Sequence, residues 1–272
     1  MFAIHSAIDR FRGHLLAAAG QGAAARFDRH LHSAPDGALA EAALFDVLFR
    51  RGLSPTLADH PSTGGIDFSC SFGGNTFAVE VTALANDTVA TRCVKLQDTA
   101  GGFTLDTNEF LGLVRKRVSS KGTNKQARSS PLPRVLAIVS GHPLADPFIR
   151  VAASELITGQ VGRAWRVGPN GAAGNSYSFT QFKNAAHLRF DPAQKSETFR
   201  PRDTLIMLAA LSAEHVALLG ILNPKPTNEL PAGAFSFLPT VQVIAGVAEP
   251  SLTVGWSSEK HDPYIHGFFK SN

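Results

Sequence analysis

Cysteine and uninterrupted apolar runs are both scarce in this chain. Two cysteines occur in 272 residues, too few for a disulfide framework or a cysteine-based zinc site. In residues 1–20 the charged residues Asp9, Arg10 and Arg12 interrupt the apolar ones, so the remaining run is too short for a signal peptide or a membrane span. We therefore expect an amphipathic N-terminal helix, no membrane association and a reducing, cytoplasmic location.

Acidic residues are missing from the stretch between Glu109 and Asp146. The basic residues in the same stretch are Arg115, Lys116, Arg117, Lys121, Lys125, Arg128 and Arg134. Such a block favours a positive surface suited to a phosphate backbone. A solvated helix face without any ligand would produce the same pattern.

The chain nevertheless contains enough apolar material for a full core, because 44% of its residues are hydrophobic and 18% are charged. We predict one α/β domain with a mixed β-sheet flanked by helices. An N-terminal helical segment covers 1–34 and ends in a linker over 30–34. The core covers 35–160, and a β-rich C-terminal extension over 161–272 packs on the same domain.

Periodicity and turn residues place the expected elements. In the core these are a helix over 35–51, a hairpin over 64–84, a polar loop over 85–102 with room for a short helix, a long helix that begins after Leu105, a buried central strand over 134–141 and a helix over 145–160. In the extension we expect two apolar strands, or a strand and a short helix, over 204–212 and 215–222, and a hairpin formed by 241–247 and 252–256. The hairpin matters most for function, because two acidic residues lie on one of its faces.

The segment GGIDFSCSFGGNTFAVEVTAL predicts the register of this hairpin as well as its existence. Gly73 and Gly74 form a two-residue turn that supplies positive φ at both positions, so Phe72 faces Asn75. Counting outward from the turn makes one face wholly apolar, as a buried sheet face must be. Cys70 lies on that face, where a reduced core thiol is expected.

The other face of the hairpin carries Asp67 directly opposite Glu80. Directly opposed side chains have Cβ atoms about 4.5–5.5 Å apart, and two carboxylates there repel unless a cation or a shared proton lies between them. A hard divalent metal ion satisfies that requirement. The alternative is an exposed ribbon whose two acids splay into water.

From about Glu41 to Gly141 the chain resembles the PD-(D/E)xK phosphodiesterases, which have the restriction-endonuclease-like fold. In that family an acid precedes a turn, and a second acid follows on the next strand, two residues before a lysine. Asp67 and Glu80 match the two acids, whereas Thr82 stands at the lysine position. The resemblance implies a metal-dependent nuclease that hydrolyses phosphodiester bonds of nucleic acid, with DNA as the expected substrate.

The resemblance also implies roles for individual residues. Asp67 and Glu80, together with the carbonyl of Val81, would hold Mg²⁺ or Mn²⁺, which activates water and offsets charge on the phosphate. Thr82 could position a water molecule. Glu41 matches the glutamate that the first core helix brings towards the metal, although the helix dipole alone also favours a glutamate near a helix N-terminus.

The positive charge of the missing lysine must then come from elsewhere. In the resembled family the helix after the hairpin carries a Lys or Gln near the active centre, and Lys121, Lys125 and Gln126 are the candidates here. We prefer Lys121, because it continues the apolar stripe of its helix. The residues expected to contact nucleic acid are Arg115, Lys116, Arg117, Lys125, Gln126 and Arg128.

Two other functions fit the same residues. One is a catalytically inactive module that keeps the nuclease fold and binds nucleic acid or regulates another protein, and Thr82 supports it. The other is a toxin or defence component that works with partner proteins. DNA or RNA as the ligand, and a monomer or a homodimer as the assembly, stay open at this point.

Overall fold

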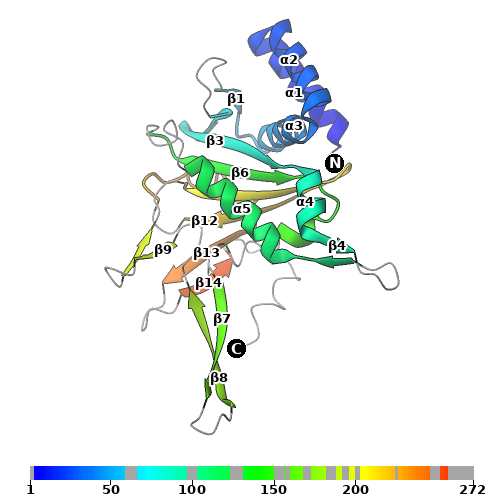
Figure 1. Ribbon diagram of the computed structural model, residues 1–272. Coiled ribbons are helices and arrows are strands. Elements are labelled where there is room, and N and C mark those ends of the chain that lie inside the picture. The colour runs from blue at the N-terminus through cyan, green and yellow to red at the C-terminus, as the bar shows by residue number, and fades with distance from the viewer. Residues whose placement is uncertain are drawn as a thin grey trace.

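The computed structural model describes residues 3–58, 66–96, 103–122, 131–149, 156, 160–167, 173–181, 188–191, 196–199, 203–223, 226–245 and 252–256. An eight-stranded mixed sheet lies at its centre, with helices on both sides (Figure 1). The α/β architecture predicted from the sequence is therefore confirmed. None of the helices within these ranges combines the length and the apolar composition that crossing a membrane requires.

The central sheet joins the predicted core and the predicted extension. Its strand order is β1-β2-β3-β6-β11-β12-β13-β14, and β3, β6 and β11 run parallel to one another. The bounds are β1 Thr56–Leu57, β2 Phe68–Phe72, β3 Asn75–Leu84, β6 Arg134–Ser140, β11 Leu205–Leu211, β12 Val216–Leu222, β13 Thr240–Ala245 and β14 Leu252–Trp256. The C-terminal strands therefore extend the core sheet and do not form a layer of their own.

The β2–β3 hairpin has the predicted register. Phe68 lies opposite Val79, and Phe72 lies opposite Asn75. The two turn glycines have φ angles of 57° at Gly73 and 80° at Gly74, which is the left-handed conformation that such a two-residue turn needs. The turn chemistry and the alternation of apolar residues thus determine this part of the fold.

Each face of the sheet has its own hydrophobic core. The helices α1 Ile4–Ala19, α2 Gln21–Ser33 and α3 Pro35–Arg50 cover one face, and the helices α4 Asn86–Cys93 and α5 Thr107–Gly122 cover the other. All seven residues of β6 are buried, so β6 is the predicted central strand. Alternate residues of every central strand therefore belong to different cores.

The prediction of a linker over residues 30–34 was wrong. Residues 21–33 form the helix α2, and Ala34 alone separates it from α3. Ala24 and Phe27 are the buried residues of α2, and the ring of Phe27 meets that of Phe11 in α1 at a centroid distance of 5.1 Å. Because few positions of α2 are apolar, its sequence shows only weak helical periodicity. The helix is stabilised mainly by packing against α1 and α3.

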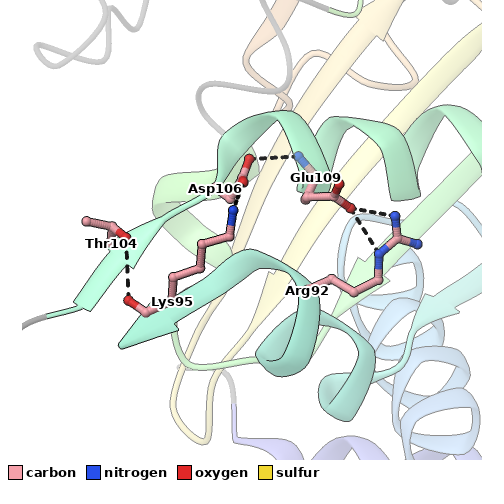
Figure 2. Close-up of polar contacts among 5 residues, drawn as sticks. All are labelled: Arg92, Lys95, Thr104, Asp106 and Glu109. Atoms are coloured by element: carbon pink, nitrogen blue, oxygen red, sulfur yellow. Dashed lines mark hydrogen bonds and ion pairs between the residues drawn. The ribbon is translucent and has the colours of Figure 1, made fainter. Parts of the chain in front are cut away.

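The start of α5 is held by a network of polar side chains (Figure 2). Asp106 accepts a hydrogen bond from the backbone N–H of Glu109 at 3.1 Å, which confirms the predicted helix start. Its carboxylate also pairs with Lys95 of β4 (Val94–Leu96) at 2.6 Å, and this contact lowers the pKa of Asp106. Glu109 forms an ion pair with Arg92 of α4, so the network joins α4, β4 and α5.

Two further hairpins precede β11 in the chain. They consist of β7 Gln160–Val167 with β8 Ala173–Gln181, and of β9 Leu188–Asp191 with β10 Ser196–Phe199. The helix predicted over 145–160 is present at 145–149, but Gln160 already belongs to β7, so its predicted end was wrong. Phe103–Leu105 form β5. This strand pairs with β4, which directly follows the C-terminal end of α4.

Replacing Gly74 by alanine should destabilise the protein by about 1–2 kcal/mol, because an L-residue resists the left-handed conformation of this turn. No atom would lie within 4 Å of the added Cβ, so the cost would be confined to the backbone. The matched control is Gly13→Ala in the middle of α1, where the added Cβ is equally unobstructed and alanine should stabilise the helix by up to about 1 kcal/mol. Urea unfolding measures both, and equal effects of the two variants would contradict the turn assignment.

Candidate functional site

Asp67 lies immediately before β2, at the open end of the hairpin. The β2–β3 ladder ends at the pair Phe68 and Val79, so the backbone N–H of Val81 has no partner on β2. The Asp67 carboxylate supplies one, because its Oδ2 accepts a hydrogen bond from the Val81 nitrogen at 2.6 Å. The N–H and C=O of one strand residue point to the same edge, so the Val81 carbonyl faces the same side as Asp67.

Asp67 and Glu41 line the same cavity. This cavity has a volume of about 450 Å³ and lies among α1, α2, α3, β1 and β2. Its lining residues are Phe11, His14, Leu15, Ala18, Ala19, Ala23, Arg26, Phe27, His30, Glu41, Thr56, Leu57, Asp67 and Phe68. The structure thus brings together two of the acids that the sequence singled out, from α3 and from the hairpin.

Glu80 points to the opposite face of the sheet and contacts a buried arginine. Its Oε2 lies 3.1 Å from Nη2 of Arg134, and Nε of Arg134 lies 2.8 Å from Oδ1 of Asp203. The three residues are only 3–4% exposed. We call these three residues the buried ion cluster; it contains two carboxylates and one guanidinium.

The parallel pairing of β3 with β6 explains the buried ion cluster. Arg134 lies opposite Ala78 and therefore projects from the same face of the sheet. Glu80 is two residues after Ala78 on β3, so its side chain projects from that face as well. The contacts are ion pairs without well-aligned hydrogen bonds, since no guanidinium nitrogen of Arg134 has a hydrogen-bond partner among the described residues. Sequence reasoning missed Arg134 and Asp203 as partners of Glu80. The available signal was a charged residue at the start of a strand whose next five residues are all apolar.

The remaining candidate residues are placed as follows. Thr82 is 8% exposed and lies on the face of Glu80, as the alternation along β3 requires. Lys121 belongs to the last turn of α5, but its side chain is outside the part of the chain that the structure describes. The same holds for the whole of residues 123–130, which include Lys125, Gln126 and Arg128.

The exposed side of α5 carries positive charge. Lys116 and Arg117 are exposed, whereas Arg115 is half-buried. Nε and Nη2 of Arg115 are buried without a hydrogen-bond partner among the described residues. The exposed side chains of Lys116 and Arg117 are available for contacts with an anionic ligand.

Cysteine and histidine chemistry is limited by burial. Cys70 and Cys93 are both free and buried, and burial raises the pKa of Cys70 to about 12. Burial also lowers the pKa of His14, whose ring lies 4.6 Å from that of Phe45. At neutral pH Cys70 is therefore a thiol and His14 a neutral imidazole, because burial favours the uncharged form of each side chain.

The donor groups near Asp67 can be compared with what a magnesium ion needs. Within the described residues there is no group of three or more His, Cys, Asp or Glu side chains arranged to hold a metal ion. Glu80 fits poorly as a ligand in this arrangement, because Arg134 pairs with its carboxylate. Asp67 and Glu41 fit better, since Mg²⁺ is commonly held by one or two carboxylates together with water and phosphate oxygens.

Removing the cation of the buried ion cluster should destabilise the fold strongly. Arg134→Met would leave two carboxylates buried together, a change that costs about 3–5 kcal/mol at comparable sites. Glu80→Gln should cost less, because it leaves Arg134 paired with Asp203. The control is Arg117→Met on the exposed side of α5, expected within about 0.5 kcal/mol of the unsubstituted protein. Similar urea midpoints for Arg134→Met and Arg117→Met would rule out the cluster as a stabilising element.

Comparison of the chain with models of protein families, with curated proteins and with solved structures finds no match. Three features of the structure bear on its function. They are the Asp67–Val81 contact at 2.6 Å, the cavity that Asp67 shares with Glu41, and the buried ion cluster around Arg134.

Proposed function

We propose that this chain is a metal-dependent nuclease that hydrolyses phosphodiester bonds of nucleic acid, with DNA as the expected substrate. We further propose that it is related to the PD-(D/E)xK phosphodiesterases. The observation that carries the proposal is the position of Asp67. Its carboxylate accepts a hydrogen bond from the Val81 amide at the open end of the hairpin, and Asp67 lines the same cavity as Glu41.

The residues that would hold Mg²⁺ or Mn²⁺ are Asp67, Glu41 and the carbonyl of Val81. When bound, the ion would supply a Lewis acid that activates water and offsets charge on the phosphate. The Val81 N–H orients the Asp67 carboxylate, and α3 carries Glu41 to the same cavity. Glu41 thereby takes the part that the sequence assigned to Glu80, whose carboxylate pairs with Arg134.

Binding to a nucleic acid backbone is supported by α5. Lys116 and Arg117 are exposed on this helix, and no acidic residue lies between Glu109 and Asp146. Positive side chains on one helix face bind phosphates with little regard to sequence and release counterions as they do so. The helix α5 is therefore assigned the role of holding the substrate backbone.

A second candidate function is supported by the buried ion cluster. The pairing of Glu80 with Arg134, and the burial of Thr82 at the motif-lysine position, favour a protein that keeps the nuclease fold and binds nucleic acid without cleaving it. The two candidates differ in their response to metal. A nuclease site should be stabilised by Mn²⁺ through mass action, whereas a binding module should not.

Asp67→Asn should abolish chelator-sensitive cleavage while leaving the protein folded. The asparagine keeps an oxygen that can accept the hydrogen bond from Val81 but loses the negative charge that a metal ion requires. Glu41→Gln should reduce cleavage for the same reason. The measurement is cleavage of plasmid, linear duplex, single-stranded DNA and RNA with Mg²⁺, Mn²⁺ or chelator.

The matched control for these variants is Asp28→Asn, which removes a carboxylate that pairs with Arg12 away from the cavity. It should cleave as well as the unsubstituted protein. Normal cleavage by Asp67→Asn would refute the assignment of Asp67. If the unsubstituted protein cleaves none of the substrates and Mn²⁺ leaves its melting temperature unchanged, the binding module is the correct function.

Lys116→Ala and Arg117→Ala should each weaken binding to unrelated duplex sequences to a similar extent. The slope of log affinity against log salt is negative, and each lost phosphate contact should make it shallower by about 0.9. The control is Arg29→Ala, which removes one exposed positive charge from α2. Fluorescence anisotropy at several salt concentrations measures the slope, and a slope that none of these variants changes would show that α5 does not contact the backbone.

A further inference from the structure

The cavity beside Asp67 is built largely from one face of each N-terminal helix. Its residues in α1 are Phe11, His14, Leu15, Ala18 and Ala19, and its residues in α2 are Ala23, Arg26, Phe27 and His30. Spacings of three and four residues place these side chains on a single face of each helix. The N-terminal helices, which lie outside the stretch that resembles a nuclease, thus form one wall of the candidate site.

Two side chains in this wall, those of Arg26 and His30, can donate hydrogen bonds to an anionic ligand. Arg26 and His30 form no ion pair or side-chain hydrogen bond within the described residues, although both line the cavity. By contrast, Arg10 pairs with Asp46 at 2.6 Å, and Arg12 pairs with Asp28 at 2.7 Å. Arg26 and His30 lie one helical turn apart, so both can reach a single anionic group.

The inner part of the cavity is aromatic. Phe11, Phe27 and Phe68 line it, and Phe11 contacts the other two rings at centroid distances of 5.1 and 5.9 Å. His14 also lines the cavity, and its Nε2 is buried without a hydrogen-bond partner among the described residues. A flat, partly polar ring could contact the phenylalanine rings and hydrogen-bond to His14, as bases do at aromatic surfaces.

We propose that this cavity receives one unpaired nucleotide of a nucleic acid strand. Its phosphate binds Arg26 and His30, and its base contacts the aromatic wall and His14. This choice of ligand rests on the proposed function, because the cavity also contains Asp67 and Glu41. The volume of about 450 Å³ falls in the range of roughly 300–1,000 Å³ that is typical of small-ligand sites.

The charges of the cavity predict that this binding depends on metal. Asp67 and Glu41 contribute two negative charges and Arg26 one positive charge, while His14 is neutral because burial lowers its pKa. The two carboxylates would repel a phosphate placed beside them. A divalent cation held by the two carboxylates would offset their charge and favour binding of the phosphate.

An unpaired nucleotide is required because a base inside a duplex has both faces covered by its neighbours. Enzymes that place a base in a pocket act on single strands or turn the base out of the helix. The inference therefore extends the proposed function from nucleic acid in general to strand ends, single strands or bases turned out of a duplex. It also assigns specificity to α1 and α2.

The test uses thymidine 3′,5′-bisphosphate, which carries a base, a sugar and two phosphates but no phosphodiester bond to cleave. Calorimetric titration of the full chain with Mg²⁺ should show binding that a chelator removes. R26A and H30A should each weaken it by about tenfold or more. R29A removes the same charge from an exposed position of α2 outside the cavity, and it should change the affinity by less than about twofold.

A second pair of variants tests the space itself. A18F places a large side chain at the cavity and should abolish binding, whereas A17F adds the same side chain to the neighbouring position of α1, outside the cavity, and should leave binding intact. Equal affinities of R26A and R29A, or full binding by A18F, would overturn the inference. If D67N loses cleavage but R26A binds the bisphosphate normally, the nucleotide site is refuted and the nuclease activity is supported. If the unsubstituted protein does not cleave but R26A still loses affinity, the nuclease activity is refuted and the nucleotide site is supported.

Discussion

The parallel pairing of β3 with β6 is the constraint on which the site depends. It sets Ala78 opposite Arg134 and continues to Leu84 opposite Ser140. Because side chains alternate along a strand, this pairing decides which face each residue serves. Glu80 and Arg134 meet beneath α5, whereas Val79 and Val81 pack beneath α1 to α3. A shift of one residue would exchange the two sets and bury the charges in the wrong core.

The two faces of the sheet consequently carry different polar centres. On the face of α5, the buried ion cluster compensates charges that would otherwise be costly to bury. On the face of α1 to α3, Asp67 and Glu41 line a cavity large enough for a small ligand. The hydrogen bond from Val81 to Asp67 lies at the edge between these two regions. It fixes the Asp67 carboxylate where the β2–β3 ladder ends, and backbone and side-chain oxygens are available there together.

Basic side chains also lie on both faces of the sheet. The exposed residues Lys116 and Arg117 lie on α5, whereas Arg26 and His30 lie on α2 at the cavity. The pattern suits a ligand that contacts the protein through a long anionic backbone and also places one of its units in a pocket. The N-terminal helices, of which α1 is joined to α3 by the partly buried pair of Arg10 and Asp46, would then contribute directly to recognition.

The sequence by itself determined those features that are encoded within a single element or a single turn. The two glycines and the alternating residues predicted the hairpin and its register, the segment after Leu105 predicted the start of α5, and the apolar run of β6 predicted a central strand. The tertiary structure alone decided that Glu80 pairs with Arg134 and Asp203, and that Glu41 shares a cavity with Asp67 and α2. The physical reason is that turn geometry and periodicity act between neighbours in the chain. Charge pairing and cavity formation depend on which distant segments are brought into register.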